Sequence, residues 1–435
     1  MITVGATGAS IPENGAALAE RAVRRTAVRM VEAVDRVPFA SCWISPEARR
    51  AADRVLDSGW VTTGHEVEAF ETEFAAYVGA RDAVAVSSCT AALELSLRQL
   101  RLPAGSPVLV PTVTFCGAVQ AVLHAGLQPV LVDVDPRSGM PDEASTTRAA
   151  LACGGPAAMV ALHWAGDPAD IPALAAAAGV PASHVVVDAA HALGTSWQGR
   201  PVGSGAAVCF SFYATKNLPI GEGGMITTDD ADKAAWLRRA RLHGLSSDAW
   251  RRYLPGGSWR YDVAEAGLKA NMTDLQAAIG RQQLLHLEDW QLRRAKIAAW
   301  YDAELAGLPG LALPHRPEPG SGRHAWHLYA VRILPEFGLT RDEVVDALNE
   351  LRIGTSVHFI PVHRLGYFSR VCTAPGGALP GAEEHFARVL SLPMHPHLDH
   401  EQVRRVCAAL ADLSGGPRRS AADDHRANVW LGRTP

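Results

Sequence analysis

Short apolar runs alternate with helical stretches over most of this chain, and this alternation limits its fold more than any other feature. The runs are apolar throughout, which is typical of strands whose two faces are both buried. Helical, often Ala-rich stretches separate most of the runs and would cover those faces. In chain order the runs are DAVAVSS, SPVLVPTVTF, PVLVDVD, AAMVALHW, HVVVDAAH, AAVCFSFYATKN and GGMITTDD. The pattern predicts an α/β fold with a mostly parallel, seven-stranded sheet in a large domain.

A second, smaller domain is expected near the end of the chain, because the pattern changes there. Residues 268–305 read as a long helical region, and mixed α+β segments follow in HAWHLYAVRI, RDEVVDALNELRI, TSVHFIPVH and EQVRRVCAAL. We therefore expect a large domain over residues 38–300 and a small α+β C-terminal domain over residues 301–414. Residues 1–37 read as an N-terminal extension with a basic helix, and the polar residues 415–435 as a mobile tail.

Charge and cysteine usage exclude several classes of function. The formal net charge is −4 and no long basic run occurs, so we expect no nucleic-acid partner. The seven cysteines are widely spaced and form no CxxC pair, which is typical of reduced thiols in a cytoplasmic protein. The charged N-terminus lacks the apolar run of a signal peptide, and no stretch of about 20 apolar residues occurs. We therefore expect a cytoplasmic protein without a membrane partner.

Polar side chains collect directly after four of the predicted strands. Ligands of a doubly wound sheet bind beyond the carboxyl ends of its strands, where these side chains would meet. The four ends carry hydroxyls, an aromatic ring, a carboxylate, a histidine and a lysine, in the runs SSCT, TVTF, DAAH and SFYATK. Each residue alone has a common structural explanation, but their convergence on one edge indicates a ligand site.

The SSCT run predicts a phosphate site. Ser88, Cys89 and Thr90 come just before a helical stretch, where unpaired backbone N–H groups and the helix dipole favour an anion. An ordinary helix N-cap is the alternative. No GxGxxG or P-loop run is present, so a dinucleotide or nucleoside triphosphate is not indicated.

The DAAH and TVTF runs suggest contacts to an aromatic cofactor. Asp188 ends an apolar strand, so we expect a buried carboxylate that needs a partner. The partner is either a local cap or ion pair, or the protonated ring nitrogen of a cofactor. His191 would project near Asp188, unless it is a satisfied core histidine. Phe115 would either join the core or lie flat on the ring.

Lys216 is notable because the chain has only four lysines among 41 basic residues. Arginine replaces lysine in most surface roles, but it cannot lose its proton and attack a carbonyl. Apolar walls around Lys216 would lower its pKa and make it a nucleophile and a proton carrier. A surface loop lysine is the alternative. Lys233 and Lys296 fall in Ala- and Arg-rich helical stretches, which is typical of surface residues.

The histidine-rich runs do not predict a metal site. His395, His397 and His400 lie in MHPHLDH, where proline indicates a solvated turn. His358 and His363 lie in a strand-like run and would face opposite sides.

A phosphate site, a stacking aromatic, a buried acid and a lysine at one sheet edge together suggest pyridoxal 5′-phosphate (PLP). From about Ile44 to Leu413 the sequence resembles the DegT/StrS family of PLP-dependent sugar aminotransferases, which have the aspartate aminotransferase fold, PLP fold type I. The motifs that carry the resemblance are WVTTGHEVEAFETEFAAYVGA, SSCTAALELSL, PTVTFCGAVQAVLHAGLQPVLVDVD, VVVDAAHALGT, FSFYATKNLPIGEGGMITTDD, ANMTDLQAAIG and TSVHFIPVH.

The resemblance implies roles for residues around the cofactor ring. Lys216 would carry PLP covalently, and Asp188 would bind the ring nitrogen. His191 would lie at the ring hydroxyl, and Phe115 would stack on the ring. We expect no metal ion in the site.

The resemblance also implies residues for the phosphate and the substrate. Cys89, Thr90 and Ser211 would hold the phosphate. Asn271 would reach the phosphate in the neighbouring subunit, in a homodimer with shared active sites. Two residues would line the substrate side, namely Thr63 and His358.

Two positions depart from the family pattern. Cys89 stands where the family often has glycine, which a backbone contact to phosphate tolerates. Ala270 stands where an aromatic residue commonly flanks Asn271, which would alter the wall of the substrate site.

The activity implied is a transamination in amino-sugar or secondary-metabolite biosynthesis. Glutamate or glutamine would pass its amino group to PLP, giving pyridoxamine 5′-phosphate (PMP). The amine would then attack the ketone of a nucleotide-linked 4-keto-6-deoxysugar, since GEGG after Lys216 resembles members that aminate C4. A keto-cyclitol of the aminoglycoside type is the alternative acceptor.

Two other functions fit less well. PLP-dependent sugar dehydratases related to the family carry histidine in place of the lysine, whereas this chain has Lys216. A catalytically silent, PLP-binding regulatory protein would not need the full set of Asp188, His191, Ser211 and Lys216.

Overall fold

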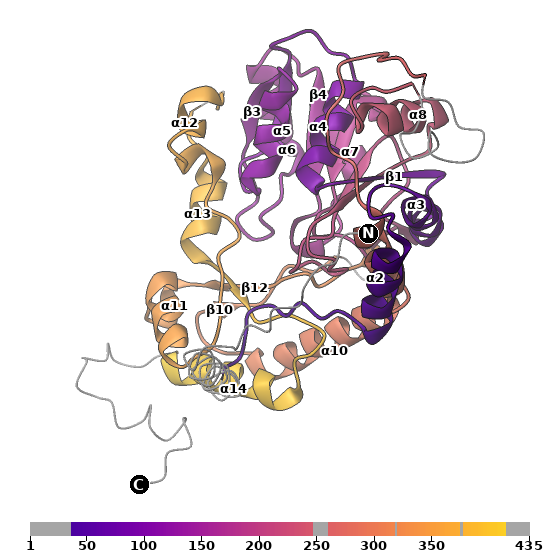
Figure 1. The fold of residues 1–435 in the computed structure, drawn as a ribbon. Helices are drawn as coiled ribbons and strands as arrows, with labels where there is room; N and C mark the ends of the chain where they lie inside the picture. Colours follow the sequence, from indigo (N-terminus) through magenta and orange to yellow (C-terminus); the bar gives the residue numbers. More distant parts are fainter. Residues whose placement is uncertain (1–35, 247–259, 318–319, 375–376, 415–435) are drawn as a thin grey trace, which may run out of the picture.

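The computed structural model describes residues 36–246, 260–317, 320–374 and 377–414 (Figure 1). The expected N-terminal extension lies outside these residues except for its last two positions, and the expected tail over residues 415–435 lies wholly outside them. No helix in the described part of the chain is both long and apolar enough to cross a membrane.

A seven-stranded sheet forms the centre of the larger part. Its strands, within the described residues, are β1 (Asp82–Val86), β2 (Pro107–Pro111), β3 (Gln128–Val132), β4 (Ala158–Leu162), β5 (Val185–Asp188), β8 (Val208–Ser211) and β9 (Gly224–Thr228). Their order across the sheet is β1-β9-β8-β5-β4-β2-β3. Only β9 runs antiparallel to its neighbours β1 and β8. The predicted mostly parallel, seven-stranded sheet is confirmed.

Helices cover both faces of the sheet, which is why almost every strand residue is buried (Figure 1). The described helices of this part are α2 (Pro46–Ser58), α3 (His65–Val78), α4 (Cys89–Gln99), α5 (Cys116–His124), α6 (Glu143–Ala152), α7 (Ile171–Ala178), α8 (Ala231–Ala240) and α9 (Asp274–Leu284). Local sequence sets where several begin. The Ser88 hydroxyl caps α4, and capping boxes start α6 at Asp142 and α9 at Thr273.

The region predicted as one long helical stretch, residues 268–305, contains two helices and an extended start. Lys269 and Asn271 form isolated bridges with neighbouring segments, so α9 begins only at Asp274. The second helix is α10 (Leu287–Leu305).

The smaller part combines a three-stranded antiparallel sheet with helices. Its strands are β10 (Leu311–Ala312), β12 (Tyr329–Ile333) and β13 (Val389–Leu392). The helices of this half are α10, α11 (Arg341–Glu350), α12 (Phe368–Val371), α13 (Pro380–Arg388) and α14 (His400–Leu413). Its buried apolar residues form a cluster separate from that of the large sheet, and the cluster includes Ile297 and Tyr301 of α10. The expected domain boundary at residue 300 falls inside α10 and stays a prediction.

A small sheet and one irregular segment complete the described fold. The strands β6 (Ser196–Trp197), β7 (Arg200–Pro201) and β11 (Gly322–Arg323) make a small third sheet. The segment TSVHFIPVH, predicted as strand-like, is irregular up to Pro361 and then enters the short 3-10 helix η5 (Val362–Arg364). Within it Ser356 forms a single bridge, to Ser391 of β13.

Candidate active site

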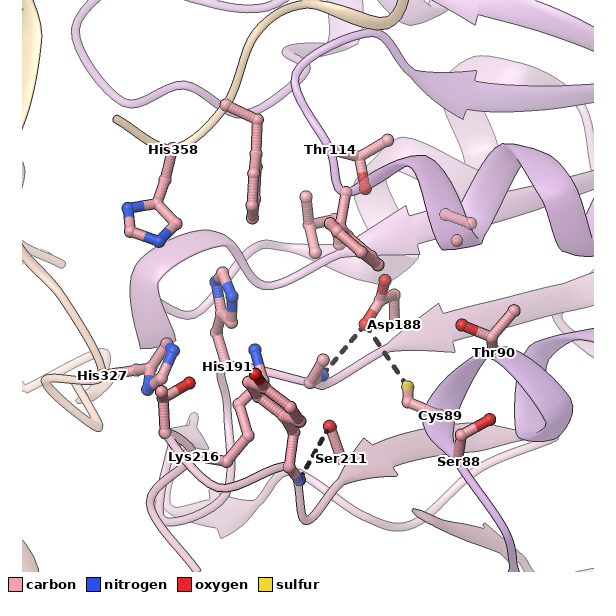
Figure 2. Close-up of a pocket in the computed structure, with 18 of the residues that line it drawn as sticks. Ser88, Cys89, Thr90, Thr114, Asp188, His191, Ser211, Lys216, His327 and His358 are labelled. Carbon is pink, nitrogen blue, oxygen red and sulfur yellow. Dashed lines mark hydrogen bonds between the residues drawn. The ribbon is translucent and has the colours of Figure 1, made fainter. Parts of the chain in front are cut away.

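A cavity of about 470 Å³ lies where the carboxyl ends of β1, β2, β5 and β8 meet (Figure 2). β1 leads into Ser88 and α4, and β2 leads into Thr114 and α5. β5 ends at Asp188, and β8 ends at Ser211. Segments far apart in the sequence therefore deliver polar side chains to one space at the sheet edge.

Most of the predicted site residues line this cavity, namely Lys216, Asp188, His191, Cys89, Thr90, Phe115, Ser211 and His358. Asn271 and Thr63 do not line it. Asn271 Nδ2 donates a hydrogen bond to Thr63 Oγ1 over 2.6 Å, and Lys269 Nζ donates to Asn271 Oδ1. Thr63, Lys269 and Asn271 therefore form a separate polar group, which we call the Asn271 cluster.

The cavity also includes residues that sequence reasoning did not place there, among them Phe39, Thr114, Glu222, His327, Phe359 and Met394. His327, Phe359 and Met394 come from the smaller part of the chain, so no local pattern near Lys216 points to them. The sequence could have indicated Glu222, because this residue lies in the GEGG run that follows Lys216.

The start of α4 offers a cradle for a phosphate. The Ser88 hydroxyl accepts from the Ala91 N–H over 3.1 Å. Among the described residues, no hydrogen bond uses the N–H groups of Cys89 and Thr90, as expected for the first residues of a helix. A Cβ on Gly117 would lie 2.6 Å from Thr90 Oγ1, so glycine keeps space for that hydroxyl.

Ser211 faces this cradle from the end of β8. Its Oγ accepts from the Tyr213 N–H over 3.3 Å, which leaves the hydroxyl proton for another acceptor. Gly224 of β9 packs directly against the first turn of α4, because a Cβ there would lie 2.5 Å from the Ser88 carbonyl carbon. The cradle is thus assembled from β8, β9 and α4.

Asp188 presents one free carboxylate oxygen. Its Oδ1 accepts from the Ala190 N–H over 2.9 Å and faces Cys89 Sγ at 3.9 Å. No hydrogen bond among the described residues uses Oδ2. Burial raises the pKa of this carboxyl, while hydrogen bonding and the charge of Lys216 act in the opposite direction. A buried acid of this kind is suited to a cationic N–H donor.

Lys216 carries a buried amine. Its backbone N–H donates to the Tyr213 carbonyl over 2.8 Å, which closes the turn after β8. Burial lowers the pKa of Lys216 from 10.5 to about 8, although Asp188 and Cys89 oppose the shift. An amine with this pKa is partly neutral near pH 7 and can act as a nucleophile.

His191 presents an N–H group to the cavity. The Ala165 N–H donates to His191 Nδ1 over 3.2 Å, so the proton of the neutral ring lies on Nε2. Burial and the charge of Lys216 hold the pKa of His191 well below its usual value, which keeps the ring neutral. Phe359 stacks on this ring, with centroids 5.8 Å apart.

His358 and His363 point to different surroundings, although their segment is not a strand. His358 lines the cavity, and its Nδ1 lies 2.9 Å from Ser391 Oγ. Burial lowers the pKa of His358 to about 4. His363 lies 2.8 Å from Thr112 Oγ1 and 2.6 Å from Glu383 Oε1, outside the cavity lining.

Two sequence predictions about surface residues are wrong. Lys233 of α8 is only 6% exposed. His395, predicted in a solvated turn, is buried. No group of three or more His, Cys, Asp or Glu side chains that could hold a metal ion occurs within the described residues.

The groups in the cavity fit PLP. Asp188 Oδ2 suits its ring nitrogen, the His191 Nε2–H suits its phenolic oxygen, and the Lys216 amine suits its aldehyde. The unbonded N–H groups of α4, with the Thr90 and Ser211 hydroxyls, suit its phosphate. Fold and site together define a PLP-dependent enzyme of fold type I.

Comparison with known proteins gives the family. The profile of the DegT/DnrJ/EryC1/StrS aminotransferase family matches residues 43–411, and the chain belongs to that family. SpsC of Bacillus subtilis (strain 168), a spore coat polysaccharide biosynthesis protein, is 42% identical over 387 residues, which cover 87% of this chain and 97% of SpsC. The resemblance described from the sequence motifs is confirmed.

Solved structures agree with this assignment. DesV of S. venezuelae is 35% identical, with a TM-score of 0.76, and the match covers 88% of this chain and 99% of DesV. The PMP form of Spr1654 from Streptococcus pneumoniae is 28% identical, with a TM-score of 0.78, and the match covers 87% of this chain and 98% of Spr1654. A PLP form of Spr1654 matches as well. The chain is therefore a PLP-dependent aminotransferase of a sugar aminotransferase family.

The two residues that depart from the family pattern, Cys89 and Ala270, differ in whether they line the cavity. Cys89 Sγ lies beside Asp188 Oδ1 and 3.6 Å from the Cys209 carbonyl oxygen, and burial raises the pKa of its thiol. The thiol therefore stays protonated and donates toward the carboxylate. Ala270 is buried among backbone pairs with Ser87 and Arg241, outside the cavity lining.

Proposed function

We propose that this aminotransferase passes the amino group of glutamate or glutamine to a nucleotide-linked 4-keto-6-deoxysugar. Transamination in the cavity is supported by the buried amine of Lys216, whose pKa is lowered to about 8 and which shares the cavity with Asp188. The sugar class is supported by the family and by the similarity to SpsC, a spore coat polysaccharide biosynthesis protein. The reaction would take place in the cytoplasm.

The cofactor ring would be held by three side chains. Asp188 Oδ2 would accept a hydrogen bond from the protonated ring nitrogen. This bond would stabilise the ionised carboxylate of Asp188, which burial alone disfavours. The His191 Nε2–H would donate to the phenolic oxygen. Phe115, which is 59% exposed beside the cavity, would cover one ring face.

The phosphate would lie at the start of α4. The N–H groups of Cys89 and Thr90 would donate to it, together with the hydroxyls of Thr90 and Ser211. No lysine or arginine side chain is needed for these contacts, because the helix terminus supplies the positive partial charge.

Lys216 would serve as the proton carrier. Bound PLP supplies an electron-withdrawing ring that acidifies the C–H bond next to the transferred amino group. The neutral Lys216 Nζ would take up that proton and later return it, for which a pKa of about 8 is well matched near neutral pH. The apolar walls of the cavity, including Leu93, Leu162 and Phe359, would exclude water from this transfer.

We propose that the active enzyme is a homodimer with shared sites. The Asn271 cluster lies outside the cavity of its own chain, which supports the interpretation that Asn271 serves the neighbouring subunit. Phe115, Tyr213 and Ile360 are large apolar side chains that are 59%, 47% and 49% exposed. A second subunit over these residues would cover them and complete the substrate side, which we assign to Thr63 and His358.

A panel assay tests this function. The purified enzyme, PLP and either glutamate or glutamine would be incubated with nucleotide-linked keto-deoxysugars and with keto-cyclitols, and products would be identified by mass spectrometry. We expect amination of the 4-keto-6-deoxysugar at C4. Lys216→Ala should remove this activity, whereas Lys296→Ala, at an exposed position of α10, should retain it.

Other outcomes of the assay are equally informative. Amination of keto-cyclitols alone would replace the proposed acceptor. A sugar product that has lost oxygen without gaining nitrogen would indicate a dehydratase, a reaction that the presence of Lys216 argues against. No turnover of any acceptor or donor by the PLP-loaded enzyme would favour a silent, PLP-binding protein.

A further inference from the structure

One backbone turn holds two histidines at the cavity wall. His191 and His327 are both buried, both line the cavity, and their ring centroids lie 4.4 Å apart. The Ala165 N–H donates to His191 Nδ1, and the Ala165 carbonyl accepts from the Leu328 N–H over 3.2 Å. The residue after His327 is thus bound to Ala165, the residue whose N–H orients His191.

Gly166 permits this close approach. It adopts a φ of +91°, and a Cβ there would lie 2.8 Å from the His191 carbonyl oxygen and 3.3 Å from the His327 nitrogen. Its carbonyl accepts from the Ala325 N–H over 2.9 Å. The backbones that carry the two rings are therefore packed at Gly166 without space for a side chain, which brings the two chain segments close together.

Asn217 sets the tautomer of His327. Asn217 Nδ2 donates to the carbonyl oxygens of Leu193 and Ala325, over 3.3 and 2.9 Å. The amide cannot be turned over, because its oxygen would then face two carbonyl oxygens. Asn217 Oδ1 therefore lies toward His327 Nδ1, at 3.1 Å, and His327 Nδ1 donates to it. The Nε2 atom of the neutral His327 ring then carries a lone pair.

The two histidines consequently present opposite groups to the cavity. His191 is fixed as an N–H donor at Nε2, and His327 is fixed as an acceptor at Nε2. No hydrogen bond joins the two rings among the described residues. Burial holds the pKa of His327 well below its usual value, with smaller contributions from His191 and Lys216, so the lone pair persists near neutral pH. The N–H group of His191 would bind the phenolic oxygen of the cofactor, whereas the Nε2 lone pair of His327 has no partner in the proposed function.

Lys216 lines the same cavity as this acceptor. Asn217, which fixes the tautomer of His327, follows Lys216 directly in the chain. The charge of Lys216 contributes to the lowered pKa values of His191 and His327. In Figure 2 the Lys216 side chain points toward the part of the cavity where His191 and His327 lie. Lys216 Nζ makes no hydrogen bond with another described residue, and His191 offers it a donor rather than an acceptor.

We propose that His327 is a positioning residue whose Nε2 lone pair accepts a hydrogen bond from the Lys216 amine. This role rests on the proposed function, because Lys216 needs an acceptor while its amine is free to carry a proton. The bond would direct one N–H toward His327 and would stabilise the ammonium form after proton uptake. Asn217 would act one step further away, by keeping the acceptor tautomer in place.

Other groups also act on the charge of Lys216. Asp188 and Cys89 favour the ammonium form, and desolvation disfavours it. Further titratable side chains line the same cavity, namely His191, His358, Tyr213 and Glu222. A test must therefore change the acceptor and leave all of these in place.

Paired substitutions of His327 isolate the acceptor. His327→Asn keeps a polar group near Nδ1 but has none at the Nε2 position, whereas His327→Gln places an amide oxygen there. The measurement is the pH dependence of Lys216 methylation by formaldehyde and cyanoborohydride, read by peptide mass spectrometry on the full-length protein, both cofactor-free and loaded with PMP. Exposed Lys296 serves as an internal control in each sample.

We expect a midpoint near pH 8 for Lys216 in the wild type. His327→Asn should lower it by about one pH unit, since a hydrogen bond to the charged form is lost. His327→Gln should stay close to the wild type. An unchanged midpoint in His327→Asn, or equal shifts in both variants, would overturn the acceptor role.

Folding and the proposed function are checked separately. Thermal unfolding shows whether each variant folds. If His327→Asn does not fold, Asn217→Ala replaces it, and we expect a smaller fall in the midpoint, whereas no fall would overturn the proposal. Wild-type protein that fails to take up PLP on Lys216 would contradict the proposed function itself, whatever the His327 variants show.

Discussion

At the scale of single residues, burial controls the reactivity of Lys216. Its pKa falls to about 8 because desolvation disfavours the ammonium form, and the carboxylate of Asp188 only partly offsets this. The unfolded chain would hold the same proton up to its ordinary pKa of 10.5. Between these two values the folded protein binds fewer protons, so its stability rises with pH there.

This shift gives a prediction for cofactor uptake. The neutral amine attacks the aldehyde of PLP, so the rate of covalent attachment should rise with pH and level off above about pH 8. The rate would be followed by absorbance after cofactor-free enzyme is mixed with PLP at a series of pH values. A rate that keeps rising toward pH 10.5 would show that Lys216 is solvated rather than buried.

The residues of the site differ in how far the sequence could predict them. Asp188 and Ser211 stand at strand ends and Lys216 lies in the turn after β8, so their place at one edge follows from the parallel sheet. His327 could not be found in this way, because it reaches the cavity from the smaller part of the chain through its contact with Asn217. Burial of Lys233 also depends on packing that a helical pattern does not reveal.

At the scale of elements, the cradle depends on how closely β9 approaches α4. A Cβ on Gly224 would lie 2.5 to 2.7 Å from backbone atoms of Ser88 and Cys89, which have no flexible end that could move aside. Gly224→Ala should therefore destabilise the fold by about 1–3 kcal/mol. It should also weaken PLP binding, since the N–H groups of α4 would be displaced.

A matched glycine controls for the substitution itself. A Cβ on Gly366 meets no atom within 4 Å, and this residue is exposed. Gly366→Ala should leave both unfolding and PLP affinity close to the wild type. Chemical denaturation and spectroscopic titration with PLP measure the two effects, and equal behaviour of Gly224→Ala and Gly366→Ala would contradict the close packing of β9 against α4.

Element boundaries show where local sequence is sufficient. The seven strands of the large sheet were recognisable because each is apolar and ends at a polar run. TSVHFIPVH has the composition of a strand, yet tertiary contacts leave it irregular at the cavity wall. The capping box at Thr273 marks the start of α9, although the preceding residues share its helical composition.

At the scale of the whole molecule, the Asn271 cluster argues for sites completed by a second chain. Mixed dimers of Lys216→Ala and Asn271→Ala test this directly, because one of their two sites would combine the native Lys216 of one subunit with the native Asn271 of the other. Random mixing should restore about a quarter of wild-type activity.

The result depends on where Asn271 acts. If it served the cavity of its own chain, no mixed dimer would contain a complete site, and mixing would restore nothing beyond the average of the two variants. Subunit exchange would be followed with differently tagged chains, so that a failure to mix is recognised before activity is compared.

The central claim is that Lys216 holds PLP and releases it when an amino donor reacts. Borohydride reduction of the PLP-loaded enzyme, followed by peptide mass spectrometry, locates the cofactor among four candidate lysines. We predict the adduct on Lys216, and its loss when glutamate or glutamine is added before borohydride, because the amino group then resides on the cofactor. An adduct on Lys233, Lys269 or Lys296, or an adduct on Lys216 that neither donor removes, would contradict this account.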